Sequence, residues 1–262
     1  MKKLIVILAA MLLLTACSQP AATNEDRSLQ NILDKQEFVL GFTQYPPLGY
    51  LDNNNPVGFD IDIAKEVMSR LGVTLKFQYI DWDAKTLELN SGNIDAIWNG
   101  LTITDERKLE LTFSRPYLNN RLVILSLNSN PVENIAALQG TKVGVEISSS
   151  GQFAIEKDTA LLSSLNEMIQ YQTITEALLD LQAGGIDAIV ADEVFARYAI
   201  SKNADNYFIS DDALASEQYG IGFRLNELAL ANRIDEILDE MVADGTAARI
   251  SEAWFGDDVI LR

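Results

Sequence analysis

The sequence predicts an α/β protein in which a parallel strand–helix–strand unit occurs twice. An internal repeat indicates the duplication: residues 89–97 recur with six identities at residues 181–189, and Gln78-Tyr79 matches Gln170-Tyr171 in the same register. Each copy also has the same order: a short β-type run, a stretch of helical periodicity, a glycine and then Ile-Asp-Ala-Ile. The alternative is a chance match between two ordinary helix–turn–strand units.

The position of a binding site follows from this order. Open parallel sheets bind ligands at the carboxyl ends of their strands. Two similar sheets would therefore face each other across a cleft, and the residues just after each repeated strand would point into it. These residues are 99–107 in the first copy and 191–192 in the second.

The N-terminus is predicted to be an export signal, residues 1–17, with a basic start and an apolar run over residues 4–14. The run ends in Leu-Thr-Ala-Cys, which resembles the lipobox of bacterial lipoproteins, in which the cysteine is lipidated and becomes the new N-terminus. Cys17 is thus the predicted lipid attachment site; the alternative is an ordinary cleaved signal with an incidental cysteine. Residues 18–36 are expected to form a flexible tether.

Composition excludes several classes of protein. The formal charge of −18 becomes −20 when the two lysines of the signal are removed, and this acidity argues against binding of nucleic acid or anionic lipid. Because the chain has no histidine and one cysteine, a Ser-His-Asp triad, a Cys-His pair and a His-rich zinc site are excluded. No metal and no cofactor are expected. No apolar run after the signal approaches the ~20 residues that cross a bilayer, so the remainder is expected to be soluble.

In the first half, residues 38–42 are predicted to form a strand, and the two prolines that follow hold Tyr45 on an extended turn. Residues 61–72 are predicted to form a helix, because apolar residues recur every four positions and Gly72 stops the pattern. Asp60 is placed to cap the N-terminus of this helix.

The second half starts near Gly140 with a turn and a strand. Residues 148–151, Ser-Ser-Ser-Gly, precede a helical stretch and offer several N–H and hydroxyl donors to an anion. The alternative is a turn that acts only as an N-cap. Residues 220–223 are predicted to form a strand that returns to the first half, and residues 225–241 and 247–255 to form closing helices.

Four motifs resemble, in order and spacing, the bacterial family 3 of extracellular solute-binding proteins, which feed polar amino acids to ABC importers. The motifs are Gly58-Phe59-Asp60-Ile61-Asp62, Gly100-Leu101-Thr102-Ile103-Thr104-Asp105-Glu106-Arg107, Phe113-Ser114-Arg115-Pro116-Tyr117 and Ala191-Asp192-Glu193. The resemblance covers about residues 37–256. It implies the two-lobed periplasmic-binding-protein fold, with a mixed sheet flanked by helices in each lobe and two hinge strands. The implied limits are residues 37–127 and 221–262 for lobe 1 and residues 128–220 for lobe 2.

The resemblance also implies a site for a free amino acid. Arg107 would grip the α-carboxylate, since a guanidinium offers two parallel N–H donors. Gly100 and Thr102 would complete the contacts to the α-carboxylate and α-ammonium, and Ser150 would donate to the same carboxylate from a helix start. Asp192 would pair with the α-ammonium, and it follows its repeated strand at the same distance as Gly100 follows the other.

Tyr45 and Trp82 match the aromatic pair that would sandwich the ligand side chain. Two alternatives stay open: Arg107 belongs to the charged run 105–108, which is typical of a solvated helix start, and Trp82 lies between two aspartates, which is compatible with a surface cap over the core.

Four further residues are candidates for specificity. Phe42 stands where members that prefer cationic ligands often have an aspartate, and Glu146 stands where some relatives have a lysine or a neutral group. Trp98 and Asn99 are bulky and polar where many members have small residues. Charge favours a cationic or neutral polar ligand over glutamate or aspartate, and the sequence does not decide which amino acid binds.

The resemblance implies a monomeric, non-catalytic lipoprotein that captures a free polar L-amino acid and delivers it to an ABC-type permease. It would be exported to the cell envelope and lipid-anchored on the outer face of the plasma membrane or in the periplasm. One alternative is a ligand-sensing module for a signalling partner. The other is a periplasmic dehydratase on the same fold, for which Glu146 is the one candidate acid.

Overall fold

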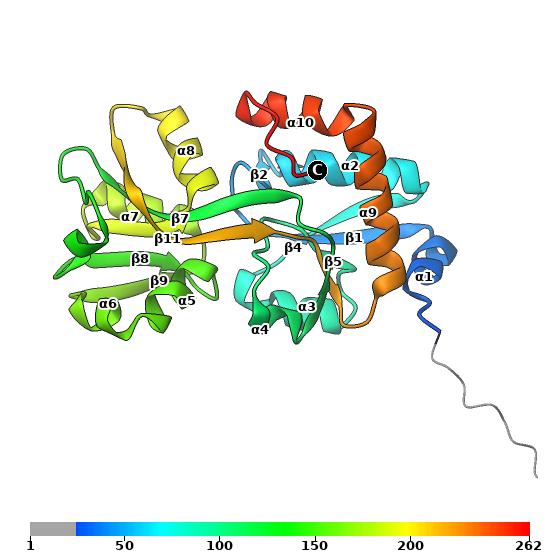
Figure 1. Ribbon diagram of the computed structural model, residues 1–262, viewed down its shortest axis with the longest axis horizontal. Coiled ribbons are helices and arrows are strands. Elements are labelled where there is room, and N and C mark those ends of the chain that lie inside the picture. Colours follow the sequence, from blue (N-terminus) through cyan, green and yellow to red (C-terminus); the bar gives the residue numbers. More distant parts are fainter. Residues whose placement is uncertain (1–24) are drawn as a thin grey trace, which may run out of the picture.

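Two five-stranded sheets form two lobes that lie side by side in the computed structural model (Figure 1). The structure describes residues 25–262, so the predicted signal and Cys17 lie outside the described residues. The sheet of the first lobe has the order β4 (Thr74–Tyr79), β1 (Glu37–Phe42), β5 (Ala96–Ile97), β12 (Gly222–Arg224), β6 (Leu111–Phe113). The sheet of the second lobe has the order β11 (Tyr207–Tyr219), β7 (Leu118–Leu127), β10 (Ala188–Asp192), β8 (Lys142–Glu146), β9 (Glu167–Tyr171).

The two copies of the sequence repeat occupy equivalent places in different sheets. In the first lobe β4 and β5 both lie parallel to β1, one on each side, and in the second lobe β9 and β10 lie in the same way around β8. The helix of each copy is followed by a glycine with a left-handed backbone, Gly92 with φ 78° and Gly184 with φ 77°. Only glycine adopts this conformation without strain, which explains why both copies keep it.

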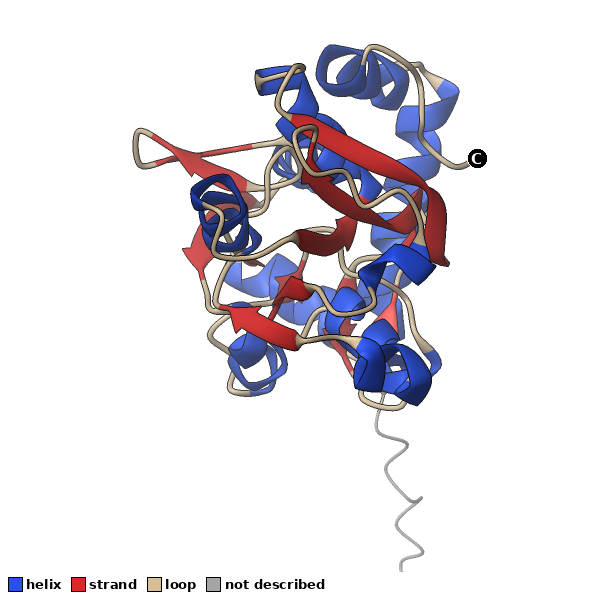
Figure 2. Cartoon of the chain, turned by 90° about the vertical axis from the view of Figure 1, so that its left-hand side faces the viewer, coloured by secondary structure: helices blue, strands red, loops and turns tan. Residues whose placement is uncertain are grey.

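Both sheets are mixed, and helices cover their two faces. In the first lobe α2 (Phe59–Leu71), α9 (Leu228–Ala243) and α10 (Thr246–Phe255) lie on one side of the sheet, and α3 (Lys85–Asn90) and α4 (Asp105–Lys108) on the other (Figure 1). In the second lobe α7 (Ile174–Ala183) and α8 (Glu193–Lys202) lie opposite α5 (Ser150–Lys157) and α6 (Thr159–Ser164). Figure 2, seen from the second lobe, shows the strands enclosed between helices.

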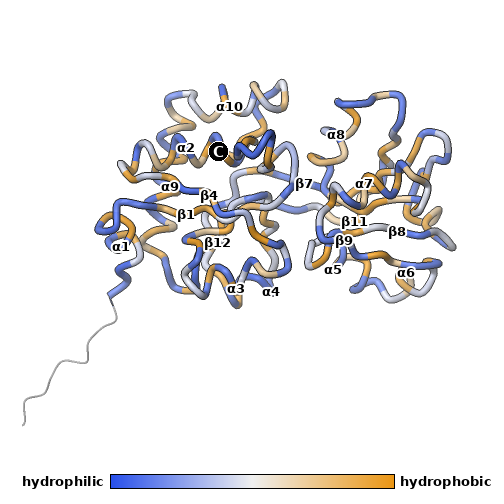
Figure 3. Tube along the Cα trace, turned by 180° about the vertical axis from the view of Figure 1, so that it is seen from behind, coloured by the Kyte–Doolittle hydropathy of each residue, from blue (hydrophilic) through white to orange (hydrophobic). Residues whose placement is uncertain are grey.

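Smaller elements complete the chain: the hairpin of β2 (Tyr50–Asp52) and β3 (Asn55–Val57), and the 3-10 turns η1 (Trp82–Ala84) and η2 (Ile135–Leu138). Hydrophobic and hydrophilic residues alternate along the outer helices, as expected for helices that pack one face on a sheet (Figure 3). None of the helices within residues 25–262 is long and apolar enough to cross a membrane.

The long strands β7 and β11 join the lobes. They are antiparallel and paired along most of their length, from Leu118 with Tyr219 at the first lobe to Leu127 with Tyr207 in the second. Both cross the gap between the lobes side by side (Figure 1). They are the two hinge strands that the family resemblance implied.

The N-terminal segment differs from the prediction. Residues 28–36 were assigned to a flexible tether, but α1 (Ser28–Lys35) is a helix whose Ile32 is buried. Helix α9 has no side-chain cap of its own, and its first N–H groups are satisfied by this segment. The Asp26 carboxylate accepts from the N–H of Ala229 at 2.6 Å, and the Ser28 hydroxyl accepts from the N–H of Leu230 at 3.1 Å.

The predicted helix cap at Asp60 is wrong. Helix α2 begins at Phe59 after Gly58 and has no side-chain cap. Asp60 is buried within the first turn, where its carboxylate accepts from the backbone N–H of Gly100 at 2.8 Å and from the hydroxyl of Tyr117 at 2.9 Å. Asp60 therefore fixes the backbone that follows β5, close to the predicted site.

Candidate functional site

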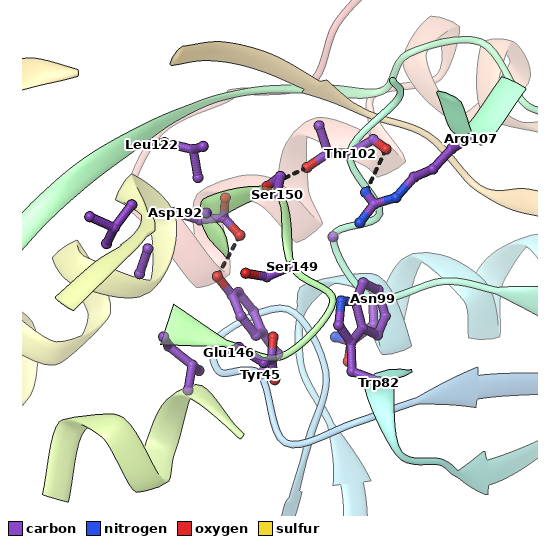
Figure 4. Close-up of a pocket in the computed structure, with 15 residues that line it drawn as sticks. Tyr45, Trp82, Asn99, Thr102, Arg107, Leu122, Glu146, Ser149, Ser150 and Asp192 are labelled. Atoms are coloured by element: carbon purple, nitrogen blue, oxygen red, sulfur yellow. Dashed lines mark hydrogen bonds between the residues drawn. The ribbon is translucent and has the colours of Figure 1, made fainter. Parts of the chain in front are cut away.

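A cavity lies between the lobes, and both lobes contribute to its wall (Figure 4). From the first lobe and the hinge strand β7 it is lined by Tyr45, Trp82, Asn99, Gly100, Thr102, Arg107 and Leu122. From the second lobe it is lined by Glu146, Ser149, Ser150, Gly151, Ile174, Val190, Ala191 and Asp192. Most of these residues follow the carboxyl ends of β1, β5, β8 and β10, the edge at which open parallel sheets bind ligands. The structure thus brings together all seven residues that the resemblance assigned to ligand binding; their contact with a ligand stays a prediction.

Arg107 turns inward from an otherwise solvated helix start. The hydroxyl of Thr104 caps α4 by accepting from the N–H of Arg107 at 3.1 Å. The guanidinium donates to the carbonyl of Thr102 at 2.8 Å and, across the cleft, to the carbonyl of Ser148 at 3.3 Å. Its neighbour Lys108 pairs with the exposed Asp105 at the surface. The charged run 105–108 is therefore partly solvated, and only Arg107 of this run lines the cavity.

Two hydroxyls from opposite lobes meet beside this guanidinium. Thr102 Oγ1 and Ser150 Oγ are 3.3 Å apart, and they lie 3.1 and 3.2 Å from the same carboxylate oxygen of Glu217. The amide of Asn120 donates to that oxygen as well, at 3.2 Å. Burial raises the pKa of Glu217 to about 7, and the negative charge of Asp192 adds to the shift. Glu217 lies on the hinge strand β11, so the cluster links both lobes to the hinge.

Asp192 ends β10 and is 7% exposed. One of its oxygens accepts a hydrogen bond from the hydroxyl of Tyr45 in the other lobe, and the other accepts from the amide of Asn120 on β7. Burial raises the pKa of Asp192, and the hydrogen bonds from Tyr45 and Asn120 oppose that shift. The acceptor predicted for an α-ammonium is therefore occupied by a protein hydroxyl in this structure (Figure 4).

Trp82 forms part of the cavity wall, and Lys85 lies next to its ring. Trp82 is 5% exposed and lines the cavity, which removes the alternative of a surface cap. The ammonium of Lys85 lies 4.8 Å from the centre of the Trp82 ring and donates to the carbonyls of Trp82 at 2.9 Å and Ser148 at 3.3 Å. Burial and the nearby charge of Arg107 lower the pKa of Lys85 to about 7.

Glu146, at the end of β8, is 2% exposed and lines the cavity. Its Oε1 atom has no hydrogen-bond partner among the described residues. Burial raises the pKa of Glu146 to about 8, and the charge of Asp192 acts in the same direction. The N–H of Ile174 at the start of α7 and the charge of Lys85 act in the opposite direction.

The other candidate specificity residues separate into two groups. Asn99 lines the cavity and also braces the loop that carries Tyr45, because it accepts from the N–H of Thr43 at 2.8 Å and donates to the carbonyl of Gly49 at 3.4 Å. Phe42 and Trp98 do not line the cavity. Both are buried in the core of the first lobe, where Phe42 meets Phe77 and Tyr79 edge to face.

Some residues of the site were missed in the sequence. Ser149 and Gly151 belong to the serine turn, residues 148–151, that the sequence analysis predicted as a possible anion site. Within that turn, ligand contact was assigned to Ser150 alone. A Cβ atom at Gly151 would lie 2.9 Å from the carbonyl oxygen of Val190, so glycine allows the start of α5 to approach β10 closely. Glu217 and Asn120 lie on hinge strands without any local motif, and no pattern in the sequence indicated them.

Comparison with known proteins gives a consistent result. The model of the family "Bacterial extracellular solute-binding proteins, family 3" matches residues 39–257. The L-cystine-binding protein TcyJ of Escherichia coli (strain K12) is 28% identical over 235 residues, which cover 88% of this chain and 87% of that protein. The ABC transporter glutamine-binding protein GlnH of Bacillus subtilis (strain 168) is 31% identical over 268 residues, covering 97% and 96%. The crystal structure of an ABC uptake transporter substrate binding protein from Streptococcus pneumoniae with bound histidine superposes with a TM-score of 0.87 at 32% identity, covering 92% of this chain and 100% of that one.

Proposed function

The chain belongs to the bacterial extracellular solute-binding proteins, family 3, and we propose that it captures a free polar L-amino acid between its two lobes and delivers it to an ABC-type permease. One observation carries the proposal. Arg107 from the first lobe and Asp192 from the second face the same cavity with opposite charges. A zwitterion that leaves water needs a fixed opposite charge at each end, and this pair supplies both.

The hydrogen bonds of Arg107 and Asp192 within the protein suggest how the ligand binds. Its α-carboxylate takes the guanidinium donors that Arg107 now gives to the carbonyls of Thr102 and Ser148. Its α-ammonium takes the Asp192 oxygen that now accepts from Tyr45. Because these partners lie on opposite lobes, the ligand bridges them and favours the closed form.

Binding without catalysis is the function proposed here, although one feature favours the dehydratase alternative. Glu146 is a buried acid whose pKa is raised to about 8, as a general acid requires. Its Oε1 atom has no hydrogen-bond partner among residues 25–262, so no described group is placed to exchange a proton with it there. The relatives compared above are binding proteins, which supports binding.

The remaining parts of the proposal concern domains and location. The proposed limits are residues 37–127 and 221–262 for lobe 1 and residues 128–220 for lobe 2. The place of β12 in the first sheet supports the return part, whereas β7 (Leu118–Leu127) lies in the second sheet, which favours an earlier end, near residue 117, for the first part of lobe 1. The protein is proposed to act as a monomer, exported and lipid-anchored through Cys17, with a tether that ends before α1. The N-terminal sequence pattern supports this anchor.

A thermal-shift screen tests the function. The mature protein is heated with each of the twenty amino acids, cystine, ornithine and citrulline; a ligand at 100 times its dissociation constant stabilises the bound form by ~2.7 kcal/mol. The best ligand is then compared with its methyl ester, which lacks the carboxylate charge, and its N-acetyl derivative, which lacks the ammonium. Both derivatives should lose most of the stabilisation. Equal stabilisation by either one, or no response to any amino acid, contradicts the proposal.

A further inference from the structure

A third charged side chain on the cavity wall has no counterpart in the site as described so far. The ionisable acids and bases that line the cavity, apart from tyrosine, are Arg107, Asp192 and Glu146. The backbone of an amino acid supplies one negative and one positive charge, which match Arg107 and Asp192. Glu146 is then a buried carboxyl group without an opposite charge.

The charge of Lys85 acts on Glu146, but among the described residues no cation forms a direct ion pair with it. The ammonium of Lys85 is directed to the carbonyls of Trp82 and Ser148, and Glu146 Oε1 still has no partner among the described residues. Arg107, the cation that lines the cavity, donates to the carbonyls of Thr102 and Ser148 and not to Glu146. An ionised Glu146 would therefore have no cation in direct contact among the described residues.

The walls near Glu146 suit a cation. Glu146 lies beside Tyr45 in the cavity, and Trp82 stands on the other side (Figure 4). Aromatic faces attract a guanidinium or an ammonium through the ring quadrupole, and the chain already shows this at Trp82 with the ammonium of Lys85. A cationic group in this position would satisfy Oε1 of Glu146 by a charge-assisted hydrogen bond.

Building on the amino-acid-binding function above, we propose that Glu146 receives a positively charged ligand side chain, so that the protein selects L-amino acids ending in a guanidinium or an ammonium. The carboxyl group of Glu146 acts as the specificity determinant, and Arg107 and Asp192 bind the part common to all amino acids. Neutral isosteres leave the carboxyl group without its partner and bind more weakly.

The proposal predicts that ligand binding changes the protonation state of Glu146. Burial and the charge of Asp192 raise the pKa of Glu146 to about 8, so without a bound cation the group is mostly neutral near pH 7. A bound cation holds it ionised, and binding therefore releases a proton. The titratable groups that face Glu146 are Tyr45, Lys85, Glu176 and Asp192. A substitution of Glu146 alone keeps all four groups, so a change in proton release is assigned to Glu146.

Arginine and citrulline form the decisive pair of ligands, because they have nearly the same shape and differ in charge. Titration calorimetry of the mature protein should give an affinity for arginine at least about tenfold higher than for citrulline. In Glu146→Gln this ratio should fall below about threefold, through weaker binding of arginine. The matched control is Glu167→Gln, an exposed glutamate at the start of β9 in the same sheet, which should keep the wild-type ratio.

Proton release gives a second readout. Arginine binding near pH 7, measured in two buffers of different ionisation enthalpy, should release more protons from the wild type than from Glu146→Gln, and citrulline should show no such difference. A wild type that binds citrulline or glutamine as tightly as arginine and lysine overturns this inference and leaves the amino-acid-binding function in place. An unchanged arginine preference in a folded Glu146→Gln variant also overturns it. Absence of binding by every amino acid refutes the proposed function itself.

Discussion

The hydrogen bond between Tyr45 and Asp192 joins the two lobes directly, and its removal is an informative perturbation. In Tyr45→Phe the ring remains and the hydroxyl is lost, so a buried oxygen of Asp192 loses its donor in the closed empty form. A hydrogen bond to a charged group contributes about 1.5–3 kcal/mol. The ratio of closed to open empty protein should therefore fall roughly tenfold to 150-fold.

The ligand-bound form should respond differently. The α-ammonium of the ligand is proposed to replace the hydroxyl at Asp192, so the complex does not depend on that hydroxyl. Tyr45→Phe should bind its amino acid with unchanged or higher affinity, because the closed empty form no longer competes with binding.

Small-angle X-ray scattering and titration calorimetry measure the two effects. Without ligand the variant should have a larger radius of gyration than the wild type, and with ligand the two should agree. Tyr79→Phe, on the exposed strand β4, serves as the matched control. The reasoning is refuted if Tyr45→Phe is as closed as the wild type without ligand, or if its affinity falls more than tenfold.

Four further predictions concern ligand binding, folding stability and membrane attachment. Arg107→Ala and Asp192→Asn should each weaken binding of the identified amino acid by about 2–5 kcal/mol in calorimetry, because each leaves a buried ligand charge without its partner; near-wild-type affinity in both would contradict the zwitterion site. Trp82→Ala should weaken binding by about 0.5–2 kcal/mol or more for a cationic ligand while the thermal unfolding remains cooperative; unaltered affinity would show that Trp82 does not contact the side chain. Burial raises the pKa of Asp60 to about 7, so the folded protein holds a proton there that the unfolded chain has lost above about pH 4. The contribution of Asp60 to the free energy of unfolding should accordingly fall by up to about 1.4 kcal/mol per pH unit between pH 4 and 7 and then level off, and Asp60→Asn should flatten the measured denaturant-unfolding profile; an identical slope in the variant would contradict this pKa. Cys17→Ser should move the protein from the membrane fraction to the soluble fraction or leave the signal uncut, as judged by fractionation and mass spectrometry, and an unchanged membrane fraction would rule out the anchor.

Local patterns predicted the parts of the fold that local chemistry decides. The two Ile-Asp-Ala-Ile strands, their glycine stops at Gly92 and Gly184 and the position of the site at the carboxyl strand ends follow from periodicity and from left-handed backbone positions. The seven assigned ligand residues lie on one cavity, although that assignment came from the resemblance.

The errors concern residues whose partners lie far away in the chain. Asp60 looked like a cap because it stands at a helix start, but its partners are Gly100 and Tyr117. Residues 26–28 were predicted to belong to a flexible tether because they are polar. Asp26 and Ser28 instead cap α9, which begins about 200 positions later in the chain. Glu217 and Asn120 entered the site through the pairing of β7 with β11, which no short pattern reveals.

The capping of α9 by the N-terminal segment also decides where force from the proposed membrane anchor would enter the protein. The chain reaches the folded body at α1, at the end of the first lobe farthest from the second (Figure 1). If Cys17 carries the proposed lipid, the segment from Cys17 to Asp26 would span at most about 30 Å and would limit how far this end can lie from the membrane. This force would act on the first lobe, because Asp26 and Ser28 are hydrogen-bonded to Ala229 and Leu230 of α9, which belongs to that lobe. An anchor attached in this way would restrain one lobe and leave the other free to move about β7 and β11, so that anchoring would not hinder opening.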